Sequence, residues 1–150
     1  MNLPWAQADI EVLIPHAAPM CLLDRVLSFD AEAILCEADS HRRADHPLRG
    51  PEGVHWVHAL EYGAQAAAVH GALLARAEGA APDAGFIVSV RSLRRQGPGA
   101  WLDQGVGPLR VRARRLMGGS GGFIYEIEVS VASSCRVVGR VSVMAPGGCS

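Results

Sequence analysis

One long segment of the chain is apolar around nearly its whole circumference when it is drawn as a helix. Residues 57–77 read VHALEYGAQAAAVHGALLARA, which is rich in alanine, the strongest helix former. A helix without a polar face belongs in the interior of a domain. Gly79 and Pro82 follow the segment and predict its end. The rest of the chain must therefore fold around this helix.

The segments on either side of the helix have the patterns of strands. In residues 123–131 the apolar side chains alternate with Glu126 and Glu128, which is the period of a sheet with one buried face. The GGSGG run at 118–122 predicts a hairpin turn. Two strands, one helix and four further strands favour an α+β fold, with an antiparallel sheet of about six strands wrapped around one long central helix. The predicted strands are residues 20–30, 32–38, 85–93, 108–117, 123–131 and 136–144.

Length and composition fit one domain that spans residues 1–150. The chain has 150 residues, of which 49% are hydrophobic and 19% charged. Residues 9–15 predict a short helix that Pro15 ends. Residues 40–53 are dense in Pro, Gly, Arg and His and predict a loop that leads into the long helix.

The charges are unevenly distributed along the chain. Residues 1–90 carry five arginines against twelve acidic side chains, a net charge of −7, whereas residues 91–140 carry nine arginines against three, a net charge of +6. The overall net charge of −1 argues against a nucleic-acid-binding protein. Arg110, Arg112 and Arg114 are predicted to line one strand face, which is either a solvated surface or a docking surface for an acidic partner.

The cysteines and the N-terminus predict a reducing location. Cys21, Cys36, Cys135 and Cys149 show no CxxC spacing, so we expect reduced thiols. The first residues lack the pattern of a signal peptide, and no apolar run approaches about 18 residues, the length that spans a membrane. We therefore expect a cytoplasmic protein without membrane contact.

Glu61 and His46 are the candidate site residues. Glu61 lies in the first turn of the apolar helix, with Gln65 four residues later on the same face. The acid either interacts favourably with the positive end of the helix dipole, or it is a carboxyl group that its apolar surroundings keep protonated. His46, in the preceding loop, is suited to accept a proton near neutral pH. His70 falls on the opposite helical face and is expected to be structural.

A metal site is a weaker interpretation of the same region. His55, His58 and Glu61 are spaced by threes, but no fourth ligand and no HExxH pattern accompanies them. No GxSxG motif points to a nucleophilic serine. We therefore expect acid–base chemistry with no metal and no redox cofactor.

Several of these motifs together resemble a known family. IPHAAPMCLLDRV at 14–26, a His-Pro loop and LEYGAQAAAVHGAL at 60–73 are similar to the 3-hydroxyacyl-acyl-carrier-protein dehydratases of the hotdog fold. The similarity covers almost the entire chain and is strongest to the small dehydratase-like proteins of aryl polyene lipid synthesis. The resemblance implies dehydration of a 3-hydroxyacyl thioester on an acyl carrier protein, with His46 removing the C2 proton and Glu61 assisting the departing hydroxyl. It also implies that amides near Trp56 and Val57 polarise the thioester carbonyl and that Gln65 contacts substrate.

Some positions differ from the usual dehydratase pattern. Residues 46–61 read HPLRGPEGVHWVHALE, where these dehydratases usually have HFPG followed by the residues PGV. His55 and His58 are therefore alternatives to His46 as the base. Two other functions are compatible with the fold, namely a thioesterase and a partly or non-catalytic subunit that completes the site of a partner dehydratase. In dehydratases of this kind the loop His and the helix acid meet across a dimer interface, so we expect a homodimer or a heterodimer with a related dehydratase.

Overall fold

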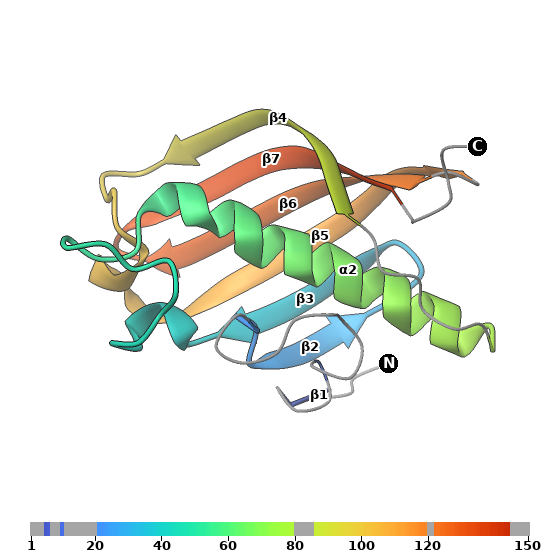
Figure 1. The fold of residues 1–150 in the computed structure, drawn as a ribbon, viewed down its shortest axis with the longest axis horizontal. Coiled ribbons are helices and arrows are strands. Elements are labelled where there is room, and N and C mark those ends of the chain that lie inside the picture. Colours follow the sequence, from blue (N-terminus) through green and yellow to red (C-terminus); the bar gives the residue numbers. More distant parts are fainter. Residues whose placement is uncertain (1–4, 7–9, 11–20, 80–85, 120–121, 145–150) are drawn as a thin grey trace.

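A curved antiparallel sheet with one long helix across it makes up the molecule (Figure 1). The computed structural model describes residues 5–6, 10, 21–79, 86–119 and 122–144. The strands lie in the order β1-β2-β3-β5-β6-β7-β4. Their bounds are β1 (Trp5–Ala6), β2 (Arg25–Phe29), β3 (Ala33–Ala38), β4 (Phe86–Gln96), β5 (Val106–Gly119), β6 (Gly122–Ala132) and β7 (Cys135–Met144).

The long helix is where the sequence predicts it. The 3-10 helix η2 (Trp56–His58) leads directly into α2 (Ala59–Ala77), which contacts β3, β5, β6 and β7. Ten of the nineteen residues of α2 are buried, which agrees with an apolar surface around most of the helix. A sheet of six main strands around one helix is the arrangement of a hotdog fold, so the predicted fold class is confirmed.

The predicted hairpin before the helix forms, but its first strand is shorter than expected. β2 begins at Arg25 rather than at residue 20. Leu22 is fully buried, yet its backbone N–H donates to the side-chain oxygen of Gln65 on α2 at 2.9 Å instead of to a neighbouring strand. This segment therefore anchors the helix rather than extending the sheet.

The loop predicted at 40–53 contains one turn of 3-10 helix, η1 (Ser40–Arg42). Arg49 holds the loop together, because its guanidinium donates to the carbonyls of His41 and Arg43 and pairs with Asp103 at 3.0 Å. Asp103 belongs to the short helix η3 (Leu102–Gln104) and also accepts from the Val54 backbone N–H. The loop and the β4–β5 connection are thus tied to each other beside the start of α2.

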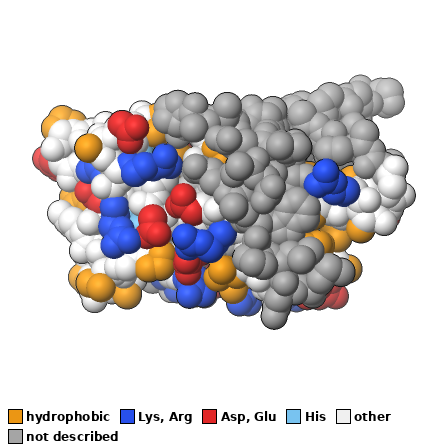
Figure 2. Space-filling model, turned by 90° about the horizontal axis from the view of Figure 1, so that it is seen from below, with side chains coloured by type: hydrophobic (Ala, Val, Ile, Leu, Met, Phe, Trp, Pro, Cys, Tyr) orange, Lys and Arg blue, Asp and Glu red, His pale blue; other side chains and the backbone are white. Residues whose placement is uncertain are grey.

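The face of the sheet that points away from α2 is covered with charged side chains. Arg110, Arg112 and Arg114 are all exposed there, as the alternation of the sequence predicts. Arg110 pairs with Glu37 on β3, and Glu37 also pairs with Arg25 on β2. Seen from the β2 side, positive and negative side chains lie intermixed (Figure 2).

Cys36 and Cys135 are buried free thiols, and Cys21 is buried as well. Cys149 and most of the helix expected at 9–15 fall outside the described residues. Within the described part of the chain, no helix is long and apolar enough to cross a membrane.

Candidate functional site

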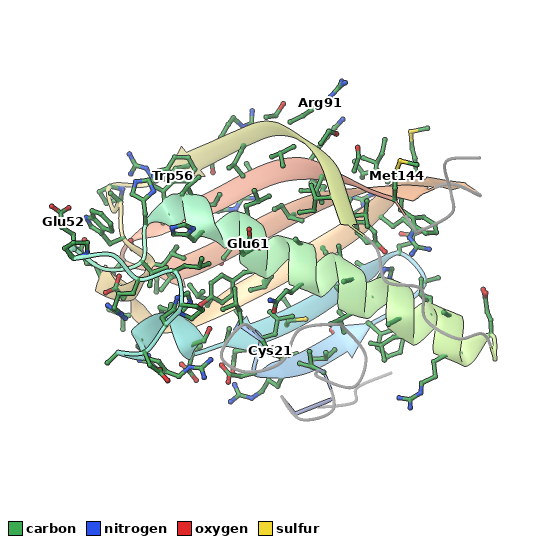
Figure 3. All side chains as sticks on the ribbon, viewed as in Figure 1. Cys21, Glu52, Trp56, Glu61, Arg91 and Met144 are labelled. Carbon is green, nitrogen blue, oxygen red and sulfur yellow. The ribbon has the colours of Figure 1, made fainter. Side chains whose placement is uncertain are left out.

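Glu61 lies on the side of α2 that faces away from the sheet (Figure 3). Gly63, two residues further and about 200° around the helix, faces Ile127 of β6. Glu61 is accordingly partly exposed, and none of the described residues forms a hydrogen bond or ion pair with its carboxylate. The start of α2 thus presents one carboxyl group without a hydrogen bond or ion pair in the described part of the chain.

His58 is the titratable group next to Glu61. It is the residue before α2 and is one helical turn from Glu61, so both lie on one face of the helix start. Burial lowers the pKa of His58, its interaction with the His55 imidazole lowers it further, and the charge of Glu61 raises it. The surroundings of His58 therefore disfavour its protonated form.

Two aromatic residues surround His55. Its ring lies 5.6 Å from that of Trp56 and 5.2 Å from that of Trp101, measured between centroids. Nδ1 of His55 accepts the backbone N–H of Val57 at 3.2 Å, which caps the short helix η2. A β-bridge between His55 and Trp101 joins this capped turn to the β4–β5 connection.

His46 is buried in a directional chain of hydrogen bonds. Its Nδ1 accepts the Leu48 backbone N–H at 3.0 Å, so the ring proton is on Nε2, which donates to the Tyr62 hydroxyl at 3.0 Å. Ser40 Oγ gives its proton to the Leu22 carbonyl, so Tyr62 donates to Ser40, each at 2.6 Å. Both nitrogens of His46 are therefore engaged within the chain.

The environment of His46 also opposes its protonation. The side chain is 5% exposed, and this burial, together with the charges of Arg43 and Arg49, lowers its pKa to about 4. Its hydrogen bond goes to Tyr62 rather than to the neighbouring Glu61. Within one chain, the structure does not join the predicted base to the predicted acid.

The three predicted substrate-binding residues also have partners. The Trp56 backbone N–H donates to the Ala100 carbonyl at 2.9 Å, and that of Val57 donates to His55. Gln65 is 2% exposed and holds the Leu22 backbone. The roles of these three residues toward substrate stay predictions, and an oxyanion site at the two amides would require their present hydrogen bonds to break.

Ser40, Tyr62, Arg49 and Asp103 shape this region but were not singled out as site residues from the sequence. A buried hydrogen bond at Tyr62 could have been predicted, since a tyrosine in a buried helix needs a partner for its hydroxyl. Across the described ranges, no three His, Cys, Asp or Glu side chains are placed to hold a metal ion, so the spacing of His55, His58 and Glu61 gains no geometric support as a metal site.

A hollow of about 710 Å³ lies at one end of the sheet, but the sheet separates it from Glu61. Arg110, Ser130 and Arg136 line it, and the strand register places these three in one row on the outer face. None of the predicted site residues lines this hollow. The surface around His55, His58 and Glu61 is therefore the better candidate site.

Comparison with known proteins agrees with this architecture. The family model described as ApeP-like, ApeP dehydratase, matches residues 8–149. The dehydratase heterocomplex ApeI:P from Xenorhabdus doucetiae aligns with a TM-score of 0.80 and 25% identity, over 97% of this chain and 93% of that chain. A thioesterase mutant from Staphylococcus aureus aligns with a TM-score of 0.55 and 13% identity, over 79% of this chain and 89% of that chain.

A third solved structure shares the fold. The PaaI protein from the phenylacetic acid degradation operon of Escherichia coli aligns with a TM-score of 0.53 and 15% identity, over 79% of this chain and 80% of that chain. No curated protein sequence matches the chain.

Proposed function

Because the chain belongs to the ApeP-like dehydratase family, we propose that it dehydrates 3-hydroxyacyl thioesters on an acyl carrier protein to trans-2-enoyl thioesters. The reaction would serve fatty-acid or polyene-type lipid synthesis. The observation that carries the proposal is the carboxyl group of Glu61, partly exposed at the start of a helix that is apolar around most of its surface. No bound metal or redox group takes part in the proposed elimination.

The reaction needs one acid and one base. A base removes the C2 proton, the C2=C3 double bond forms, and the C3 hydroxyl leaves as water after it takes a proton from the Glu61 carboxyl. The family resemblance assigns the base to His46. Glu61 and His55 each interact electrostatically with His58, which supports an acid–base site at this end of α2.

Replacement of the carboxyl tests this proposal. We expect Glu61→Gln to lower the rate of enoyl formation from a 3-hydroxyacyl-carrier-protein substrate by about 10²- to 10⁴-fold, because the leaving hydroxyl loses its proton donor. Glu78→Gln is the matched control, since Glu78 is an exposed acid at the other end of the same helix. Full activity in Glu61→Gln would contradict the proposal, as would release of free thiol in place of an enoyl product.

The engagement of His46 favours a second candidate function, that of a subunit which completes the site of a partner dehydratase. A buried imidazole with both nitrogens bonded cannot reach across an interface without local rearrangement. The similar ApeI:P dehydratase is itself a heterocomplex. Under this alternative, the isolated chain is inactive and gains Glu61-dependent activity only when it is co-expressed with a second dehydratase-like chain.

A further inference from the structure

Three histidines compete for the role of base, and their lone pairs distinguish them. A neutral imidazole carries its proton on one ring nitrogen and a lone pair on the other. Only the nitrogen with the lone pair can remove a proton from carbon. A histidine whose lone pair already accepts a backbone N–H is therefore not available to act as a base.

The lone pairs of His46 and His55 are both engaged in this way. The lone pair on Nδ1 of His46 accepts the Leu48 N–H at 3.0 Å, and that on Nδ1 of His55 accepts the Val57 N–H at 3.2 Å. Each ring then has its proton on Nε2. In this form both residues are hydrogen-bond donors rather than bases.

His58 differs from both. It is partly exposed, and neither ring nitrogen has a hydrogen-bond partner among the residues that the structure describes. It shares the exposed face of the helix start with Glu61, one turn away. We infer that His58, rather than His46, is the catalytic residue that removes the C2 proton, an inference that rests on the proposed dehydratase function.

The two side chains complete the reaction between them. A ring nitrogen of His58 takes the C2 proton, and the electron pair of that C–H bond forms the C2=C3 double bond. The C3–O bond breaks as the Glu61 carboxyl gives its proton to the hydroxyl, which leaves as water. His58 then holds one extra proton and Glu61 lacks one, and return of that proton restores both groups.

This assignment gives His46 a positioning role. It orients the Leu48 amide on one side and the Tyr62 hydroxyl on the other, and so fixes the loop that leads to His55 and His58. Removing it is expected to loosen the site without removing the base.

Exchange of the C2 proton with deuterium separates the base from the acid. The full chain, alone or co-purified with a partner dehydratase chain if it requires one, is incubated in D₂O with a 3-hydroxyoctanoyl pantetheine thioester, and deuterium at C2 is measured by mass spectrometry. We expect His58→Gln to lower both exchange and elimination by about 10²-fold or more. Glu61→Gln should lose elimination and keep exchange, because the base is still present.

Each alternative has its own result. His46→Gln, which loses the imidazole ring stacked on Tyr62, should lower the melting temperature and retain exchange within about tenfold of wild type. Exchange that survives in His58→Gln and disappears in a folded His46→Gln would overturn the inference and leave the dehydratase function standing. A wild-type chain that neither exchanges nor eliminates, even with its partner, would overturn both.

Discussion

Two buried histidines are held neutral in the same way: one ring nitrogen is hydrogen-bonded to a tyrosine hydroxyl and the other to a backbone group. His46 pairs with Tyr62 and the Leu48 N–H, as described above. His70, nearer the other end of α2, donates from Nε2 to the Asp30 carbonyl and accepts the Tyr125 hydroxyl on Nδ1, each at 2.8 Å. Burial is the main reason that the pKa of each imidazole is lowered.

A neutral buried histidine makes stability depend on pH. The pKa of His46 is about 4 when folded, against an ordinary value of 6.5. Between these values the unfolded chain binds more protons, so stability is full above pH 6.5 and is lost as the pH falls toward 4. The loss assigned to His46 is up to about 3 kcal/mol.

Urea denaturation between pH 7.5 and 4.5 measures this dependence. The variant His46→Gln should be less stable than wild type at pH 7.5, and the difference should shrink toward pH 4.5 because glutamine does not titrate. Parallel stability curves for the two proteins would show that His46 is not held neutral.

Side-chain roles were only partly predictable from the sequence. An acid in an apolar helix made Glu61 a candidate, and helical periodicity placed it correctly at the helix start. The burial of His46 was not predictable, because it depends on Ser40, Leu22 and Tyr62, which come from three separate segments. The engagement of the Trp56 and Val57 amides depends likewise on Ala100 and on the rotamer of His55.

At the scale of elements, α2 approaches strand β6 closely at Gly63. A Cβ added there would lie 2.5 Å from Cδ1 and 2.8 Å from Cβ of Ile127, and the second of these atoms cannot move without its strand. Gly71 on the same helix has only the end of Arg115 nearby, at 3.8 Å. The two glycines therefore have opposite tolerances for the same substitution.

Alanine substitutions at these two glycines test the packing of the helix. We expect Gly63→Ala to destabilise the fold by about 1–3 kcal/mol through overpacking, and Gly71→Ala to stabilise it by about 0.5–1 kcal/mol through helix propensity. Chemical denaturation measures both changes. Equal effects at the two positions would mean that α2 lies further from β6 than the structure shows.

The arginine-rich outer face of the sheet has a testable role as a docking surface for the acidic carrier protein. Arg112 and Arg114 are exposed and form no close ion pair with any described residue. We expect the double variant Arg112→Ser, Arg114→Ser to raise KM for a carrier-bound substrate by about tenfold at low salt, through lost charge complementarity. KM for a pantetheine thioester should not change.

Arg76→Ser is the control for this experiment, because it removes one positive charge from the exposed end of α2. The sheet separates the outer face from Glu61, so a carrier protein docked there must present its arm around an edge of the sheet. An unchanged KM in the double variant would show that the carrier docks elsewhere and that the outer arginines only interact with solvent.

For the whole molecule, hydrophobic patterning was sufficient to predict the order of the six longer strands and the long helix along the chain, but not the two-residue strand β1. A helix without a polar face needs a wrapping sheet, and alternation along segment 123–131 identified which side of a strand is buried. Strand ends were less predictable, since Leu22 leaves the sheet for Gln65 and β5 and β6 continue into the glycine run, with Gly119 opposite Gly122. Both differences arise from long-range pairing that no local pattern records.

One edge of the sheet is open to pairing with a second chain. β4 lies at one end of the strand order, so one side of this 11-residue strand has no partner among the described residues. Val90 lies opposite the buried Val141 and therefore on the helix side, yet it is 38% exposed because no strand lies beyond it. A long edge with an exposed apolar residue favours pairing with a second chain.

We accordingly expect an obligate dimer, either of this chain or with a related dehydratase, joined along β4. Val90→Asp should shift the dimer toward monomer by at least tenfold in Kd, because the interface would bury an unpaired carboxylate. Val106→Asp is the control, since Val106 is 65% exposed on β5, away from this edge. Analytical ultracentrifugation measures both variants, and a wild-type monomer with full dehydratase activity would show that one chain builds the whole site by itself.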